Sequence, residues 1–135
     1  MQFVDTNVLL YAVSREEAEQ DKARRANEIL DSRKVALSTQ VLQEFYVQAT
    51  RASRSDPLSH EQAVGYVETL LAFDVQAVTK EIVLAALATR ERFRISYWDA
   101  AIIEAARSMG CEVVLSEDLS EQDYAGVRVE NPFTA

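Results

Sequence analysis

Residues 2–13 read Gln-Phe-Val-Asp-Thr-Asn-Val-Leu-Leu-Tyr-Ala-Val and contain the strongest fold signal in the chain. The first part, Gln2–Asp5, is a short, largely apolar stretch that predicts a β-strand ending in a carboxylate. From Thr6 to Val13 the apolar run is nearly unbroken, which predicts a buried helix. A strand that passes directly into a helix is the beginning expected of an α/β sheet.

The chain continues outward from this unit as an alternation of short strands and helices. Further strands are predicted at Val35–Leu37, Phe73–Val78, Cys111–Leu115 and Val127–Val129. Helices are predicted over residues 16–32, from Ser38 or Thr39 to about Ala52, from Ser59 onward, over Thr79–Arg92, and from Ser96 to a cap at Gly110. The pattern predicts one domain over residues 1–135 with a three-layer α/β fold, in which helices flank a mostly parallel sheet.

Two of these helices have apolar stripes that predict which side faces the core. In the helix over Thr79–Arg92 the expected inward residues are Ile82, Val83, Ala86 and Leu87. In the helix that starts at Ser96 they are Trp98, Ala101, Ile102, Ala105 and Met109. We therefore expect Trp98 to be a core residue, with stacking on a nucleic acid as the alternative.

Composition excludes several kinds of site. The 135 residues include one cysteine, Cys111, and one histidine, His60, which exclude an intrachain disulfide, a cysteine-rich zinc site and a multi-histidine site. No apolar run approaches the roughly 20 residues of a membrane helix, and the N-terminus does not resemble a signal peptide. We expect a cytoplasmic protein without a membrane partner, whose chemistry depends on carboxylates or hydroxyls.

Four acidic residues lie where an α/β sheet builds its sites. Asp5 ends the first strand, Asp118 follows the strand Cys111–Leu115, Asp99 lies in the first turn of a helix, and Glu44 lies at the edge of another helix's apolar stripe. In parallel sheets, ligands bind beyond the carboxyl ends of the strands. The four carboxylates are therefore expected to gather at one edge.

Each acid also has a purely structural explanation. Asp5 can cap the helix that follows it, and Asp99 can complete a capping box with Ser96. Asp118 can be a turn residue, and Glu44 can be a solvated surface glutamate. Taken together, however, gathered carboxylates repel one another unless a cation neutralises them, and Mg²⁺ prefers such oxygen ligands. The sequence therefore favours metal-dependent phosphoryl or phosphodiester chemistry.

Four short motifs then resemble one known family. Phe3-Val4-Asp5-Thr6-Asn7-Val8-Leu9, Gln43-Glu44-Phe45, Tyr97-Trp98-Asp99-Ala100 and Ser116-Glu117-Asp118-Leu119 occur in the order seen in PIN-domain nucleases, and most closely resemble VapC-type toxins of toxin–antitoxin modules. The resemblance extends through Val127–Phe133 and covers essentially the whole chain. It implies a PIN fold and a Mg²⁺- or Mn²⁺-dependent endoribonuclease.

The resemblance also implies residue roles. Asp5 and Asp99 would be the principal metal ligands, and Glu44 and Asp118 would complete the catalytic acidic cluster. The residues implied as supports of this site are Thr6, Asn7 and Ser116. Many relatives carry a further aspartate two or three residues beyond the position of Asp118, where this chain has Ser120 and Glu121. The number of metals, and any role of Glu117 or Glu121, stay open.

The resemblance implies three partners: an RNA substrate, an antitoxin protein and a second copy of the chain. The net charge of −8 opposes RNA binding in general, and Arg51 and Arg54 are the best candidates for a basic rim. A non-catalytic binding module and a PIN nuclease of RNA processing are alternative functions. Phosphatases of the haloacid-dehalogenase type and receiver domains are disfavoured, because Asn7 replaces an acid and no lysine follows the late strand.

Overall fold

The computed structural model describes residues 1–134. Its short strands pair mainly in parallel. Within these residues, six strands form one sheet in the order β3-β2-β1-β4-β6-β5. The strands are β1 (Gln2–Val4), β2 (Val35–Ser38), β3 (Asp74–Gln76), β4 (Val113–Leu115), β5 (Asp123–Tyr124) and β6 (Val127–Glu130). All neighbours pair in parallel except β5 and β6, which are antiparallel. The expected mostly parallel α/β sheet is confirmed.

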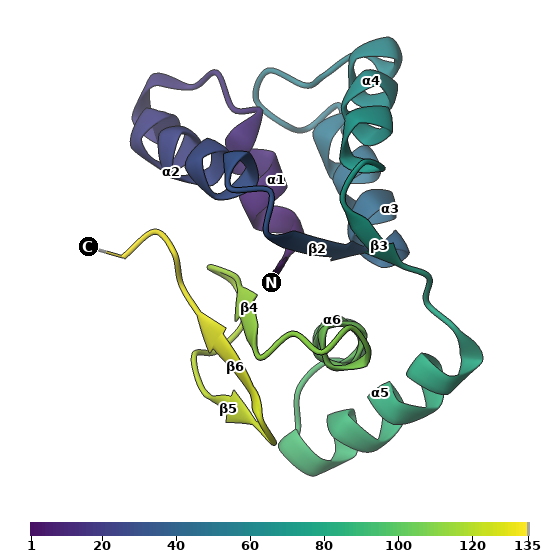
Figure 1. Cartoon of the computed structure of the whole chain (residues 1–135). Helices are drawn as coiled ribbons and strands as arrows, with labels where there is room; N and C mark the ends of the chain where they lie inside the picture. The colour runs from purple at the N-terminus through teal and green to yellow at the C-terminus, as the bar shows by residue number, and fades with distance from the viewer. Residues whose placement is uncertain (135) are drawn as a thin grey trace.

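Helices cover both faces of this sheet (Figure 1). They are α1 (Thr6–Ala12), α2 (Gln20–Asp31), α3 (Thr39–Ala49), α4 (His60–Leu70), α5 (Lys80–Phe93) and α6 (Tyr97–Ser108), with a 3₁₀ turn at Glu17–Glu19. The helices α1 to α4 lie together on one side, and α6 packs against strands of the sheet on the other. No helix in the described part of the chain is long and apolar enough to cross a membrane.

The centre of the sheet is buried from both sides. Phe3 and Val4 of β1 are fully buried, and all four residues of β2 are buried. Phe3 pairs with Ala36 of β2 and with Val114 of β4, so β1 lies between these two strands. This arrangement explains the continuous apolar runs of the strands, because a parallel strand covered by helices has no wet face.

Two expectations about helix burial are wrong. Leu87 of α5 is 50% exposed, and Trp98 in the first turn of α6 is 65% exposed. Helix α5 packs mainly on α6 rather than on the sheet, so one narrow stripe of Ile82, Ala86 and Thr89 is enough to bury its inner side. Trp98 lies outside the core because the first turn of α6 borders a surface pocket.

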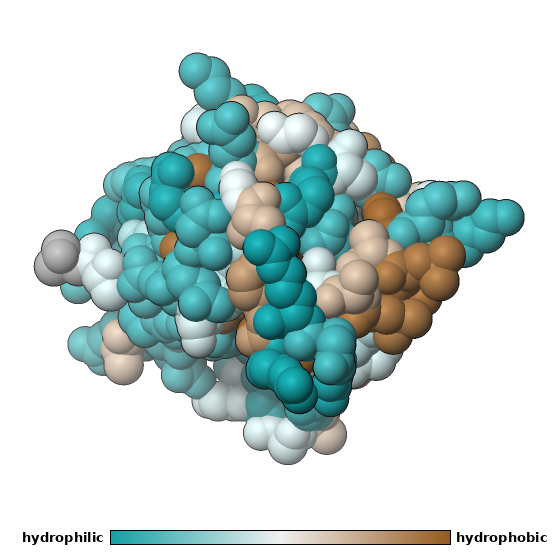
Figure 2. Space-filling model, turned by 90° about the horizontal axis from the view of Figure 1, so that it is seen from below, coloured by the Kyte–Doolittle hydropathy of each residue, from teal (hydrophilic) through white to brown (hydrophobic). Residues whose placement is uncertain are grey.

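The exposed apolar residues of α5 form part of a visible patch. Figure 2 shows hydrophobic atoms gathered on the side of the molecule where α5 lies in Figure 1, on a face that is otherwise mainly hydrophilic. Leu84, at 66% exposure, and Leu87 are the large apolar residues of α5 that remain exposed. Leu87, which was expected to face the core, therefore belongs to this exposed surface.

Two smaller differences concern the end of the chain. The short strand β5, which the sequence does not reveal, forms a tight hairpin with β6, and Gly126 in its turn has φ +98°. Cys111 precedes β4 rather than starting it, and it is buried. Gly110 follows the last residues of α6 with φ +73°, the left-handed conformation that glycine adopts at helix ends.

Candidate active site

One pocket brings the four acidic residues together at the carboxyl edge of the sheet. Asp5, Glu44, Asp99 and Asp118 all line this pocket, whose volume is about 100 Å³. They come from the end of β1, from α3 after β2, from the first turn of α6, and from the turn after β4. Residues separated by more than a hundred positions thus become neighbours because parallel strands end at the same edge.

Asp5 is the most deeply buried of the four acids, with 7% exposure. One of its carboxylate oxygens, Oδ1, accepts a hydrogen bond from the Thr6 N–H at 2.8 Å. The other, Oδ2, accepts bonds from the Ser116 hydroxyl at 2.8 Å and from the Asn7 side-chain amide at 3.3 Å. Asp5 therefore does cap α1, as its structural explanation proposed, and it also faces the pocket.

Ser116 and Asn7 connect Asp5 to the turn that carries Asp118. The Ser116 Oγ accepts bonds from the N–H groups of Asp118 and Leu119, both at 3.1 Å. The Asn7 Oδ1 accepts a bond from the N–H of Glu117 at 3.1 Å. These contacts hold the turn after β4 beside the end of β1.

The Glu44 carboxylate and the start of α6 are held by a glutamine that the sequence did not reveal as a site residue. The Nε2 of buried Gln40 donates to the Glu44 Oε1 at 3.0 Å and to the Trp98 carbonyl oxygen at 3.1 Å. Gln40 thereby joins α3 to the start of α6. Its position four residues before Glu44, on the same helix face, is the sequence signal that could have identified it.

Ser96 and Asp99 form only one of the two hydrogen bonds of a capping box, and the Asp99 carboxylate takes no part in it. The Ser96 Oγ accepts a bond from the Asp99 N–H at 3.1 Å, which caps α6. The reciprocal bond, in which the Ser96 N–H would donate to the Asp99 carboxylate, is not formed among the described residues. The side chain of Asp99 is therefore free to face the pocket.

Burial and mutual repulsion raise the pKa values of three of these acids. Burial raises the pKa of Asp5 to about 6; the bonds from Ser116 and Thr6 oppose the shift, and the charges of Glu44 and Asp118 add to it. Burial also raises the pKa of Glu44 and that of Asp99, and the charge of Asp99 adds to the rise at Glu44. A cation in the pocket would relieve this repulsion.

The donor atoms fit a hydrated divalent cation. Carboxylate oxygens are the ligands that Mg²⁺ and Mn²⁺ prefer, and the buried Thr6 Oγ1 has no hydrogen-bond partner in the described structure. Within residues 1–134, however, no three Asp, Glu, His or Cys side chains lie close enough to hold a metal together. The geometry therefore suits an ion that retains several waters, as Mg²⁺ commonly does.

Glu117 and Glu121 have other partners. Glu117 accepts bonds from the Tyr11 hydroxyl at 2.5 Å and from the Lys22 ammonium at 2.6 Å, and these partners lower its pKa. Glu121 accepts a bond from the Asn131 N–H at 3.3 Å. Neither carboxylate lines the acidic pocket.

The two arginines predicted at the rim are placed differently. Arg54 lines a second pocket of about 180 Å³, and this pocket adjoins the acidic one because both are lined by Asn7, Leu10 and Asp118. The guanidinium of Arg54 donates to the Leu10 carbonyl at 3.4 Å. Arg51 is exposed on the surface and lines neither of these pockets.

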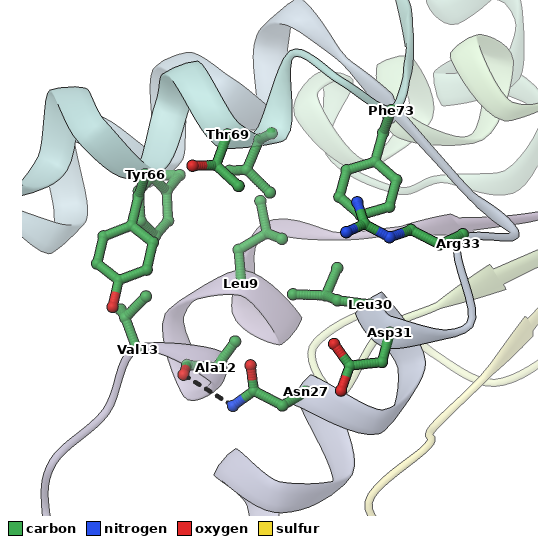
Figure 3. Close-up of a pocket in the computed structure, with 12 residues that line it drawn as sticks. Leu9, Ala12, Val13, Asn27, Leu30, Asp31, Arg33, Tyr66, Thr69 and Phe73 are labelled. Atoms are coloured by element: carbon green, nitrogen blue, oxygen red, sulfur yellow. Dashed lines mark hydrogen bonds between the residues drawn. The ribbon is translucent and has the colours of Figure 1, made fainter.

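A separate apolar cavity of about 200 Å³ contains none of the four acids (Figure 3). Its walls come from α1, α2, α3 and α4 and include Leu9, Leu30, Phe45 and Phe73. This lining suits an apolar side chain and provides no paired carboxylates for hydrolysis. The acidic pocket is therefore the candidate site for chemistry.

Comparison with known proteins agrees with this fold. The PIN domain family model matches residues 3–126. No curated protein sequence matches the chain. Among solved structures, a toxin–antitoxin complex from Klebsiella pneumoniae is 21% identical, with a TM-score of 0.73 and full coverage of both chains.

Two further solved structures are similar. VapC20 of Mycobacterium tuberculosis, a toxin that cleaves the sarcin–ricin loop, is 22% identical with a TM-score of 0.69 over 87% of this chain and 90% of its own. FitAcB of Neisseria gonorrhoeae is 20% identical with a TM-score of 0.69 and full coverage of both chains. At these identities the likeness shows a shared fold.

Proposed function

Since the chain belongs to the PIN domain family, we propose that it is a Mg²⁺- or Mn²⁺-dependent endoribonuclease and the toxin of a toxin–antitoxin pair. The observation that carries this proposal is the convergence of Asp5, Glu44, Asp99 and Asp118 on one pocket. The solved toxins with the same fold support the biological role, and one of them cleaves RNA.

The residues of the pocket have different proposed roles in phosphodiester hydrolysis. Asp5 and Asp99 are the proposed principal ligands of the cation, and Glu44 and Asp118 complete its acidic surroundings. When bound, a divalent cation supplies neutralisation of the phosphate charge and activation of water. Ser116 and Asn7 hold the Asp5 carboxylate in place, and Thr6, whose buried hydroxyl has no hydrogen-bond partner in the described structure, lines the same pocket.

The proposed partners follow from charge and surface. An antitoxin with a basic segment complements a chain of net charge −8 whose pocket gathers carboxylates. The proposed homodimer needs an apolar surface, and the exposed leucines of α5 are the candidate region.

The first experiment is cleavage of total cellular RNA in Mg²⁺ or Mn²⁺ by the wild type, Asp5→Asn, Asp99→Asn and Asp21→Asn. Asp21 is the matched control, since its side chain is 95% exposed on α2 and lies outside the pocket. We expect discrete fragments from the wild type and Asp21→Asn. We expect at least an approximately 100-fold loss in the two pocket variants, because even residues that only support metal ligands contribute up to about that factor.

Metal titration by calorimetry separates the enzyme from a non-catalytic module. Heat of Mg²⁺ or Mn²⁺ binding that disappears in Asp5→Asn, together with cleavage, supports the enzyme. No cleavage and no metal binding would favour the interaction module. Growth arrest on expression, relieved by a co-expressed partner, distinguishes a toxin from a nuclease of RNA processing.

A further inference from the structure

Trp98 is the one tryptophan of the chain and has an unusual position for its residue type. Its side chain is 65% exposed, although tryptophan is normally highly buried. It lines the acidic pocket and immediately precedes Asp99, one of the proposed metal ligands. A large flat aromatic group therefore stands at the mouth of the proposed active site.

The backbone of Trp98 is held while its ring is left accessible. The Trp98 carbonyl oxygen accepts a bond from the side chain of buried Gln40, which also donates to Glu44. The neighbouring Tyr97 ring contacts the indole edge-on, with centroids 5.1 Å apart and an interplanar angle of 82°. No other ring in residues 1–134 pairs with the indole, and the residue is 65% exposed, so the indole is accessible to a planar group.

Core packing does not explain this residue. Ala101, Ile102 and Ala105 of α6 fill the space beneath the sheet and are almost completely buried. Burial of the indole would add far more apolar contact than its present position provides. Its exposure beside four carboxylates points instead to a ligand that has both a planar apolar part and an affinity for a metal-neutralised acidic pocket.

We propose that Trp98 stacks on an unpaired nucleobase next to the scissile phosphate, and so restricts the substrate to single-stranded segments of RNA. This inference rests on the proposed ribonuclease function. A nucleobase is planar, and its attached phosphate is the group that the acidic pocket would process. Bases in an A-form duplex are stacked inside the helix, whereas bases of loops and ends can be splayed onto aromatic side chains.

Stacking would also offset part of the repulsion between this acidic protein and RNA. A chain of net charge −8 gains little from general attraction to phosphates. Base–aromatic stacking does not depend on charge and tolerates any base, because every base has a π-face. Trp98 would therefore supply affinity that the sparse basic groups around the pocket do not.

The main competitor is burial of Trp98 by a second copy of the chain. Interface centres are typically depleted of charge, whereas Trp98 stands among carboxylates of the pocket. The nucleobase is therefore the favoured occupant. A second copy remains a distinct outcome of the experiment.

Because the chain has one tryptophan, its fluorescence reports directly from the mouth of the pocket. The wild-type protein is titrated in EDTA and low salt with a mixed-sequence 12-nucleotide single-stranded RNA, and with the same RNA annealed into a duplex. Without divalent metal the probe is not consumed by the proposed reaction. We expect saturable quenching by the single strand and at least about 5-fold weaker quenching by the duplex.

A second measurement uses cleavage kinetics in Mg²⁺ with three variants. Trp98→Ala is expected to raise KM about 10-fold with a smaller change in kcat, and Trp98→Phe is expected to retain most of the affinity. Leu71→Ala is the matched control, since Leu71 is also exposed and apolar but does not line the pocket. A small loss in Leu71→Ala beside a large loss in Trp98→Ala supports stacking.

The outcomes distinguish this inference from the function on which it rests. Cleavage by a wild type whose fluorescence ignores single-stranded RNA would leave the ribonuclease intact and overturn stacking. Equal quenching by the duplex would overturn the selection of single strands. A blue shift that depends on protein concentration, with equal losses in Trp98→Ala and in Leu84→Ala on the proposed dimer surface, would assign Trp98 to a dimer interface. Quenching without any cleavage would retain stacking and contradict the enzyme.

Discussion

Asp5 combines a structural and a proposed chemical role in one side chain. Its Oδ1 caps α1 through the Thr6 N–H, while its Oδ2 is held by Ser116 and Asn7. Burial makes the charged form unfavourable and raises the pKa to about 6. The residue thus retains an electrostatic cost that a bound cation would offset, as functional sites commonly do.

The cost of burying the charged Asp5 carboxylate predicts that the free energy of unfolding, measured in EDTA, depends on pH. The pKa of Asp5 is raised in the folded protein, so the folded state retains a proton that the unfolded chain loses near pH 4. Stability from this group therefore falls as the pH rises from about 4 through about 6. Between pH 5 and pH 7.5 the wild type should lose about 1 kcal/mol more than Asp5→Asn, which has no charge to develop.

Urea unfolding of both proteins at the two pH values measures this difference. Asparagine is a good helix N-cap, so the variant is expected to fold. Mg²⁺ added at pH 7.5 should stabilise the wild type and leave Asp5→Asn unchanged. Identical pH dependence in the two proteins would contradict the predicted burial cost of Asp5.

At the scale of elements, α6 serves the site at one end and the sheet edge at the other. Its first turn presents Trp98 and Asp99 to the pocket. Near its last turn, Arg107 bonds to Glu104, and its Nη1 and Nη2 donate to the carbonyl oxygens of Ala125 and Tyr124, both at 2.7 Å. Glu104 is buried and also accepts a bond from Thr89 of α5. The helix thereby connects α5 and the β5–β6 hairpin.

Arg107→Ala is expected to destabilise the protein by about 2–3 kcal/mol. The change leaves the buried Glu104 carboxylate without its charged partner and two carbonyl groups without their donor, and unpaired buried charges are costly. Arg107→Lys should rescue only part of the loss, because an ammonium lacks the planar fork of donors.

The matched control for this prediction is Arg24→Ala. Arg24 forms an exposed pair with Asp21, with side chains 67% and 95% exposed, and such pairs contribute about 0–1 kcal/mol. Urea denaturation at pH 7.5 compares the free energies of unfolding. Equal losses in Arg107→Ala and Arg24→Ala would show that the Glu104–Arg107 network does not stabilise the hairpin.

At the scale of the whole molecule, an acidic protein is proposed to bind a polyanion. The pocket itself is negative, so attraction of the RNA phosphates depends on the cation and on the few basic groups that surround it, whereas stacking on Trp98 needs neither. Arg54 lines the pocket that adjoins the acidic one, and Arg51 lies exposed three residues before it in the chain. These two groups are the proposed basic rim.

The double reversal Arg51→Glu/Arg54→Glu is expected to weaken RNA binding and to flatten its dependence on salt. Each lost phosphate contact should reduce the slope of log K against log salt concentration by about 0.7 for single-stranded RNA. Fluorescence polarisation measures the binding of a labelled single-stranded RNA at salt concentrations from about 50 to about 300 mM KCl, and the slope is taken from these affinities. Arg24→Glu on α2 is the control, and an unchanged slope in the double variant would remove the two arginines from the rim.

The sequence by itself determined the local units and the set of acids. Alternating apolar segments, helix caps and the first strand–helix unit predicted the parallel α/β sheet, because these signals depend on neighbours a few positions apart. The order of the short acidic motifs resembled the PIN family, and the family match over residues 3–126 confirms that resemblance. The sequence is enough to identify the acids without any distance between them, because strands of a parallel sheet end at one edge.

Only the tertiary structure decided how those acids are held and what surrounds them. Gln40 joins α3 to α6, and Lys22 donates a hydrogen bond to Glu117; both contacts link residues far apart in the chain. The exposure of Trp98 likewise depends on how distant elements pack. The spacing of apolar residues in α5 and α6 does not distinguish a helix packed against other elements on one side from a helix packed on both sides. Exposure depends on which layer a helix joins and where the sheet ends, and these are properties of the folded assembly of elements.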